Sequence, residues 1–174
     1  MTIFKKSNSS DTEYYIYDSS GNRVRKITHF SSNKETRETI YLSGVELKRI
    51  YQGTAILKRK DHSVMDDKNR IAIVNTWTLD TNSWELDSPL SENDSPVVKT
   101  RYQLGNHLGS ATLELDENGS VISFQEYYAY GGTSYTIGEV SSAYRFTGKE
   151  LDEFSGLYYF GARYYCHWTC RWMS

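Results

Sequence analysis

Hydrophobic and polar residues alternate in short runs along this chain, and a period of two predicts β-strands. The runs Tyr14–Tyr17 and Arg23–Ile27 flank Asp18–Asn22, where Asp, Ser and Gly favour a tight turn. We therefore expect a β-hairpin at 14–27. By the same pattern, further strands are expected at 38–42, 45–51, 54–59, 70–78, 100–104, 111–115 and 121–127.

Turn composition separates these strands. A polar stretch at 65–69 precedes the strand at 70–78, and Asp80–Pro96 contains both prolines together with many Ser, Asn and Asp residues. We expect a hairpin turn at 65–69 and a loop or insertion at 80–96. An Asp-x-x-Gly pattern recurs at Asp18–Gly21 and Asp116–Gly119. One such hairpin cannot bury its own apolar face, so neighbouring hairpins must stack.

Composition narrows the classes of partner. The 15 tyrosines and 12 glycines among 174 residues fit strands joined by tight turns. With 20 basic and 22 acidic residues the net charge is −2, which argues against nucleic acid or an anionic membrane surface as the main partner. No run of apolar residues is long enough for a membrane helix, and the N-terminus has no signal-peptide core.

Several segments resemble the Rhs/YD-repeat family. The segment Tyr17–Arg23 resembles a YD repeat, and the last 75 or so residues resemble the Rhs repeat-associated core. The core-like segments are Asn106–Ser110, Tyr127–Gly131 (with Ala129 where the family has Pro), Tyr144–Asp152 and Gly156–Tyr165. A further segment at 64–72 is similar to the C component of insecticidal Tc toxin complexes.

The resemblance implies an all-β fold of irregular YD-repeat hairpins, stacked as part of a curved, shell-like sheet. It divides the chain into YD-repeat-like hairpins at 1–79, a loop or insertion at 80–99 and the Rhs core at 100–174. It assigns structural roles to the family-motif residues, which are Tyr17, Asp18, Gly21, Asn106, His107, Gly109, Gly148, Gly161, Arg163 and Trp172.

The function that the resemblance implies is that of a toxin-shell segment enclosing a C-terminal effector. The implied partners are the rest of the shell, including a B-component-like protein, and the enclosed toxin, and the complex would be secreted or exported. We expect no catalysis and no cofactor. Two alternatives remain: a part of the shell's aspartyl-type self-cleaving protease, and a carbohydrate- or surface-binding module formed by the aromatic residues.

The chain departs from the family pattern near its end. The family has Pro and Gly where this chain has His167 and Cys170, which puts the local turn in doubt. The Asp-Pro motif of the self-cleaving site does not follow before Ser174, so we expect a shell segment rather than a protease.

Three groups of residues invite a chemical role. Cys166, His167 and Cys170 suggest a metal site, but zinc usually needs a second pair of ligands, so a terminal turn is favoured. His62 with the pair Asp66–Asp67 suggests acid–base chemistry, but Asp-Asp-Lys-Asn is turn composition. For His107, which stands between two glycines, we favour a hydrogen bond to the backbone of a tight turn.

Overall fold

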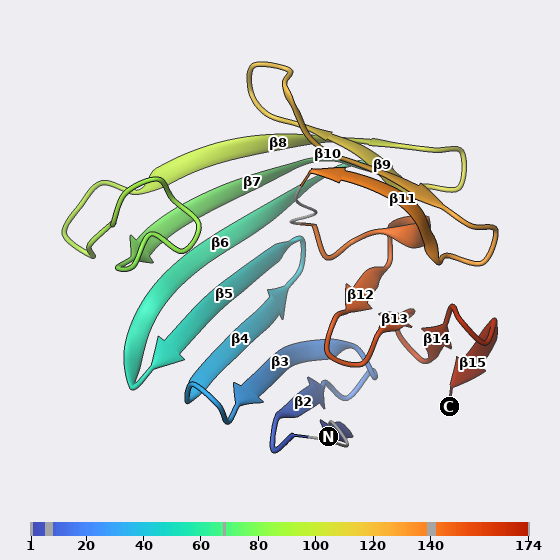
Figure 1. Cartoon of the computed structure of the whole chain (residues 1–174), viewed down its shortest axis with the longest axis horizontal. Coiled ribbons are helices and arrows are strands. Elements are labelled where there is room, and N and C mark those ends of the chain that lie inside the picture. Colours follow the sequence, from blue (N-terminus) through green and yellow to red (C-terminus); the bar gives the residue numbers. More distant parts are fainter. Residues whose placement is uncertain (1, 6–8, 68, 139–141, 174) are drawn as a thin grey trace. The chain divides into compact units, whose positions relative to one another are not determined.

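The computed structural model describes residues 2–5, 9–67, 69–138 and 142–173, which form β-strands joined by turns and one 3₁₀ turn, η1, at Phe146–Gly148. An eleven-stranded sheet follows the sequence order β1 to β11, and a four-stranded sheet follows the order β12 to β15 (Figure 1). The strands are β1 Thr2–Lys5, β2 Thr12–Tyr17, β3 Arg23–Phe30, β4 Glu35–Leu42, β5 Val45–Gln52, β6 Thr54–Asp66, β7 Asn69–Asp80, β8 Val97–Gly105, β9 Ala111–Leu115, β10 Val121–Tyr127, β11 Thr133–Gly138, β12 Glu150–Asp152, β13 Leu157–Tyr159, β14 Tyr164–Cys166 and β15 Arg171–Met173.

The predicted all-β fold is confirmed, including the hairpin of β2 and β3, in which Tyr14 lies opposite Ile27. The predicted end of the strand that begins at Thr54 was wrong. The prediction ended a strand at Arg59, whereas β6 continues to Asp66, so Met65 and Asp66 belong to the strand rather than to the turn. Asp67 adopts the turn conformation with φ 51°, and Lys68 lies outside the described residues.

Five turns share one backbone geometry. In each, the first N–H donates to the carbonyl of the fifth residue, and the N–H of the fourth residue donates to the carbonyl of the first. These turns are 18–22, 106–110, 116–120, 128–132 and 145–149. The fourth residue is always a glycine at positive φ, between 65° and 89°, which other residues adopt only with strain. The Asp-x-x-Gly pattern seen in the sequence is therefore one form of a more frequent turn.

The side chain of the first residue reinforces three of these turns. Asp18 Oδ1 accepts hydrogen bonds from the N–H groups of Ser20 (2.9 Å) and Asn22 (2.8 Å), and Asp116 repeats this with Asn118 and Ser120 at 2.8 Å each. The bond from the Asn22 backbone is the main reason that the pKa of Asp18 lies below its usual value. Asn106 uses its amide oxygen in the same way.

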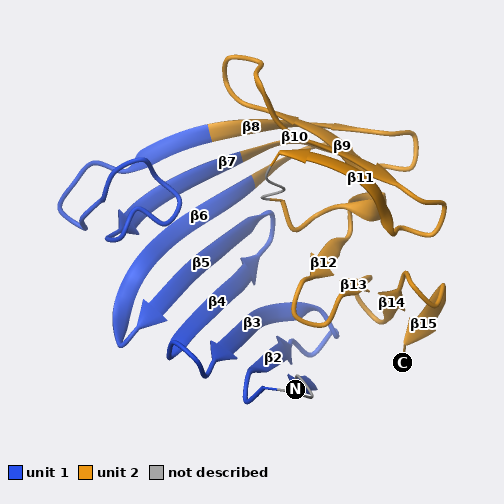
Figure 2. Cartoon of the chain, in the orientation of Figure 1, with its two compact units in different colours: residues 1–62, 74–99 blue, residues 63–73, 100–174 orange. Residues whose placement is uncertain are grey.

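The chain has two compact units, drawn in different colours in Figure 2: residues 1–62 with 74–99, and residues 63–73 with 100–174. Strands β6, β7 and β8 each contribute residues to both units. In the first unit a small apolar cluster forms where Trp77 packs with Leu86 and Leu90.

This cluster gives structure to the segment predicted as a loop at 80–99. Asp80 is completely buried, and its carboxylate accepts hydrogen bonds from the backbone N–H groups of Trp84 (2.8 Å), Glu85 (2.9 Å) and Leu86 (3.0 Å). The segment is therefore folded back onto β7 around one carboxylate, and residues 97–99 already belong to β8.

A buried ionic cluster lies on the strand face of the first unit. Glu46 and Asp61 are directly opposed across β5 and β6, a repulsive arrangement that Lys48 relieves, since its Nζ lies 3.3 Å from Glu46 and 2.9 Å from Asp61. Arg59, two residues before Asp61 and thus on the same face, contacts both Asp61 oxygens at 2.7 and 2.9 Å. Asn75 donates to Asp61 at 2.6 Å.

These partners decide the ionisation of Asp61. Burial favours the neutral acid, but the charges of Lys48 and Arg59 outweigh it and hold the pKa of Asp61 well below its usual value of 3.8. A carboxylate whose pKa is lowered by folding stabilises the folded state at pH values above its unfolded-state pKa. This stabilisation is lost as the pH falls from the unfolded-state pKa towards the lower folded-state pKa. The cluster should therefore stabilise the fold at neutral pH, and this stabilisation should be lost in acid.

The second unit contains its own polar ladder and an aromatic layer. Gln103 Nε2 donates to Glu114 (2.8 Å) and to Ser142 (3.0 Å), and Ser123 donates to the other oxygen of Glu114 at 3.2 Å. The phenol of Tyr158, in β13, donates to the carbonyl of Gly131 at 3.1 Å. The Tyr158 bond ties the four-stranded sheet to the turn that follows β10.

We expect the substitution Asp61→Asn to destabilise the chain by about 1–3 kcal/mol at pH 7, because Lys48 and Arg59 each lose one of the two carboxylates that they contact. Between pH 5 and pH 2 the wild-type free energy of unfolding should fall more steeply than that of the variant. Urea unfolding at several pH values measures both effects. As a control, Glu92→Gln removes the exposed partner of Lys58 and should change stability by less than about 1 kcal/mol. If the free energies of unfolding of wild type and D61N fell equally between pH 5 and pH 2, the lowered pKa of Asp61 would be contradicted.

Candidate functional site

The ten family-motif residues fall into separate places in the structure. Tyr17 ends β2, and Asp18 and Gly21 belong to the turn between β2 and β3. These three residues lie in the first unit, and the other seven lie in the second unit. Of these, Asn106, His107 and Gly109 form the turn between β8 and β9, and Gly148 belongs to η1. Gly161, Arg163 and Trp172 lie at the four-stranded sheet. The motifs thus mark turns and a packing cluster.

Two of the core-like segments lie against each other. Thr147 N donates to Ser110 Oγ at 2.9 Å, and Ala111 N donates to the carbonyl of Arg145 at 3.1 Å. A side chain at Gly148 would meet the carbonyl oxygen of Gly109 at 3.3 Å, so glycine is needed there for close approach as well as for its φ of 65°. The turn 106–110 and the segment 145–149 therefore form one packed unit.

His107 does not have the role predicted for it. Its side chain is exposed, and within the described parts of the chain it forms no hydrogen bond, whereas Asn106 Oδ1 accepts from Leu108 N (3.0 Å) and Ser110 N (3.1 Å). Among the described residues the predicted bond from His107 to the turn backbone is not formed, because the first residue of the turn, Asn106, is the one whose side chain reaches the free N–H groups.

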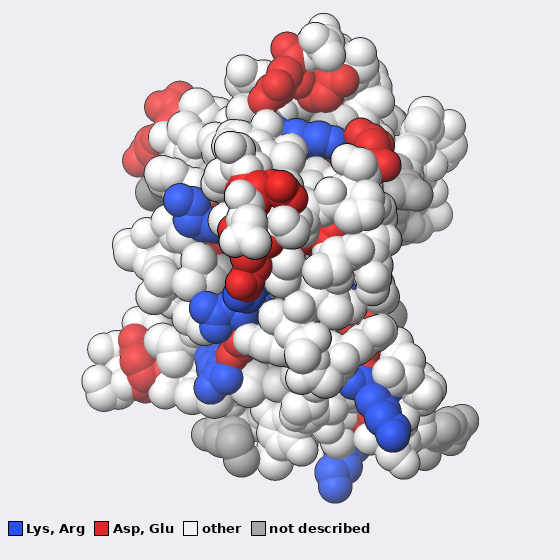
Figure 3. All heavy atoms as spheres, turned by 90° about the vertical axis from the view of Figure 1, so that its left-hand side faces the viewer, with Lys and Arg blue, Asp and Glu red and all other residues white. Residues whose placement is uncertain are grey.

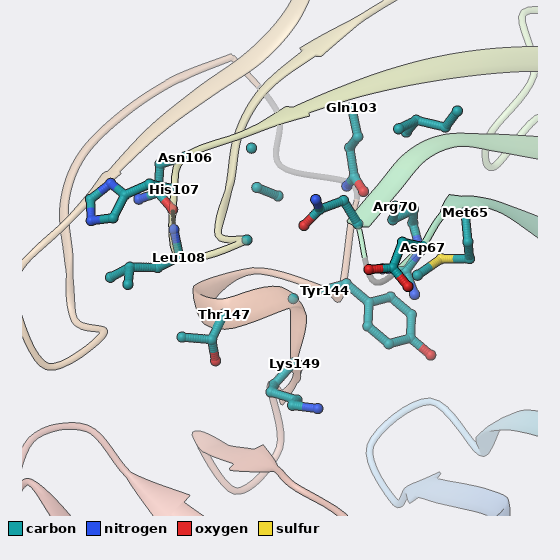
Figure 4. A pocket seen from close by; sticks show the side chains of 16 residues that line it. Met65, Asp67, Arg70, Gln103, Asn106, His107, Leu108, Tyr144, Thr147 and Lys149 are labelled. Atoms are coloured by element: carbon teal, nitrogen blue, oxygen red, sulfur yellow. Dashed lines mark hydrogen bonds between the residues drawn. The ribbon is translucent and has the colours of Figure 1, made fainter.

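A cavity of about 780 Å³ opens beside this packed unit and lies wholly within the second unit. Its lining comes from the β6–β7 hairpin, from the end of β8 with the turn to β9, and from the segment 144–149 (Figure 4). Arg70 stacks on the ring of Tyr144 with its Cζ 3.5 Å from the ring centroid. Neither residue was predicted as a site residue, because their contact joins segments that are far apart in the sequence.

The C-terminal motif residues form an aromatic cluster. The ring of Trp172 lies 4.8 Å from that of Phe160 and 5.2 Å from that of Tyr165, and the Arg163 guanidinium lies 4.4 Å from its centroid. Such edge and cation–π contacts each add a modest stabilisation to packing. Gly161 permits the bend before β14 with a φ of 87°.

The departures at His167 and Cys170 leave the terminal turn intact. Cys170 stands where the family has glycine, and it keeps the left-handed backbone with φ 54°, a conformation that costs a non-glycine residue about 1–2 kcal/mol. Cys166 is buried, Cys170 is exposed and both are free thiols. Within the described residues no group of three or more His, Cys, Asp or Glu side chains could hold a metal ion.

Tyrosines mainly bond within the sheets. Tyr51 donates to Glu38 at 3.2 Å, Tyr127 donates to the carbonyl of Ala111 at 2.7 Å, and Tyr165 donates to the carbonyl of Tyr130 at 3.1 Å. Burial, opposed by the Arg145 guanidinium, raises the pKa of the Tyr158 phenol. The phenols of Tyr51, Tyr127, Tyr158 and Tyr165 therefore act as donors that cross-link turns and strands.

Positively and negatively charged side chains are mixed on one face of the chain. Figure 3 shows Lys and Arg side chains next to Asp and Glu side chains on the face turned to the viewer, and no broad field of one sign covers that face. Among the described residues, no helix is long and apolar enough to cross a membrane.

Comparisons with known proteins link this architecture to toxin subunits. No family model matches the chain. Two curated relatives are toxin subunits of Yersinia entomophaga: YenC1, 36% identical over 99% of this chain, and YenC2, 32% identical over all of it. The chain spans 17% and 18% of the lengths of these relatives.

Solved structures agree with the sequence comparison. A crystal structure of TcdB2-TccC3 matches 98% of this chain with a TM-score of 0.78 and 32% identity, and the matched region is 8% of that chain. A structure of the Photorhabdus luminescens Tc holotoxin pore with a mutated TccC3 matches equally well. The resemblance predicted from the motifs is confirmed: over its whole length the chain is homologous to a part of Tc toxin subunits.

Proposed function

We propose that this chain is a structural segment of a Tc-type toxin shell that encloses a C-terminal effector, and that it has no catalytic activity of its own. The observation that supports this most is the similarity to toxin subunits along the whole chain, at a TM-score of 0.78 to TcdB2-TccC3. We further propose that residues 100–174 are the Rhs core of that shell.

The roles of the motif residues support a structural function. Asn106, Asp18 and Gly148 hold turns or permit close backbone approach, and Trp172 packs against aromatic rings. Residues that form such contacts stabilise the fold of a structural segment, whereas a catalytic residue would have to face a reacting group. The self-cleaving protease and the carbohydrate-binding module remain alternatives without a contact that favours them.

The proposed partners follow from the same similarity. The outermost strands of the large sheet are β1 and β11, and all residues of β11 are exposed. Exposed edge strands pair readily with further strands. We propose that the rest of the shell, including a B-component-like protein, covers these edges, that the effector lies inside, and that the complex is exported.

We expect the substitution Asn106→Ala to destabilise the chain by about 1–2 kcal/mol, because it leaves two turn N–H groups without their acceptor. His107→Ala should change stability by less than about 0.5 kcal/mol, since the His107 side chain is exposed. Urea or thermal unfolding of both variants measures the difference. Equal destabilisation by the two substitutions would show that His107 has a structural role after all.

The isolated chain should associate in a concentration-dependent way, because β11 exposes the large apolar side chains of Tyr135 and Ile137 at 52% and 50%. Light scattering after size exclusion measures this. The double variant Tyr135→Lys/Ile137→Lys should shift the chain towards monomer. The matched control, Ser20→Lys/Asn93→Lys, adds the same charge at exposed turn and loop positions and should not. A wild-type chain that is monomeric at all concentrations would contradict the proposal that the chain is a segment of a shell.

Placing this chain into a relative tests the function directly. Under the proposal, a YenC1 chimera in which this chain replaces the matching 17% should assemble and should protect its enclosed region from an added protease to the same extent as unmodified YenC1 measured in parallel. An assembled chimera whose cargo is digested at the rate of free cargo would overturn the proposal.

A further inference from the structure

The cavity of the second unit has a lining suited to an organic anion. Its charged side chains are Arg70 and Lys149 against Asp67, which leaves one net positive charge among the described lining residues. Met65, Ile71 and Leu108 add apolar surface, and each of these side chains is about half exposed. A cavity of this size, partly apolar with a few polar groups, is typical of sites for small organic ligands or short peptides.

Arg70 is held in place and keeps its binding edge available. One face of the guanidinium stacks on Tyr144, and Nε donates to Ser63 Oγ at 3.0 Å. These two contacts fix the plane of the group without using its Nη1 and Nη2 atoms. In the described chain Arg70 forms no ion pair. A fixed guanidinium with two free donors matches a carboxylate in the bidentate manner.

Lys149 supplies a second cation from a different element (Figure 4). Its Nζ lies 5.5 Å from the Phe160 ring centroid, and the part of the chain that the structure describes offers it no carboxylate within ion-pair distance. By contrast, Gln103 Nε2 already donates to Glu114 and Ser142. Arg70 and Lys149 are therefore the cationic groups of the lining that can pair with an anion.

We propose that this cavity binds a carboxylate, presented by an acidic side chain of a peptide, with Arg70 as the bidentate partner and Lys149 as the second cation. A planar carboxylate fits the fixed fork of Arg70, and its aliphatic stem fits the apolar side chains beside it. The single net positive charge favours a monoanion over a dianionic phosphate, which Asp67 would repel. The proposal is independent of the shell function.

Calorimetric titration of the whole chain with three probes tests the proposal: a blocked Ala-Glu-Ala-Ala peptide, butyrate and inorganic phosphate. The peptide should bind and phosphate should bind at least about tenfold more weakly. Butyrate binding as tightly as the peptide would overturn the assignment to a peptide in favour of a free small carboxylate. Phosphate binding as tightly as the peptide would overturn the carboxylate assignment itself.

Four variants locate the site. Arg70→Gln should weaken peptide binding by about tenfold or more, and Lys149→Gln, at an exposed side chain that should not affect folding, by several-fold. Asp67→Asn should strengthen it, because the competing carboxylate is removed. Arg171→Gln is the matched control: it removes one positive charge at an exposed residue of β15 and should leave affinity unchanged. If R70Q and K149Q bind like wild type, or if R171Q weakens binding equally, the cavity is not the site.

Discussion

A backbone turn with glycine as its fourth residue is the constraint on which this fold depends. Each turn forms two hydrogen bonds between its first residue and its fourth and fifth residues, and this geometry needs a positive φ at the fourth. A turn so defined returns the chain antiparallel and in a set register, so consecutive strands pair. The turns at 18–22 and 116–120 link paired strands in this way, while 145–149 shows that the same geometry also serves a packing role.

Buried polar side chains take the place of a large apolar core. In the first unit Asp61 is surrounded by Lys48, Arg59 and Asn75, and in the second Gln103, Glu114 and Ser123 form a hydrogen-bonded row across three strands. Such groups contribute modest net stability but are costly to separate, because each would leave a buried charge or donor without its partner. They therefore favour one strand register over a shifted one.

The family motifs converge for a physical reason. Turn 106–110 and segment 145–149 are far apart in the sequence, yet Ser110 accepts from Thr147, and Gly148, which has no Cβ, lies close to the carbonyl oxygen of Gly109. A larger residue at position 148 would crowd that carbonyl. The same contact positions Tyr144 under Arg70 and so forms one side of the cavity.

The sequence by itself determined the all-β fold, most strand positions and the turns, because alternation and glycine act between near neighbours. It determined less at β6, where the mainly polar residues 60–66 continue the strand, and at 80–96, where Asp80 organises an apparent loop. Only the tertiary structure decided that Asn106 rather than His107 holds its turn, and that Arg70 meets Tyr144. Those outcomes depend on the direction of side chains and on contacts between distant segments, which no local pattern encodes.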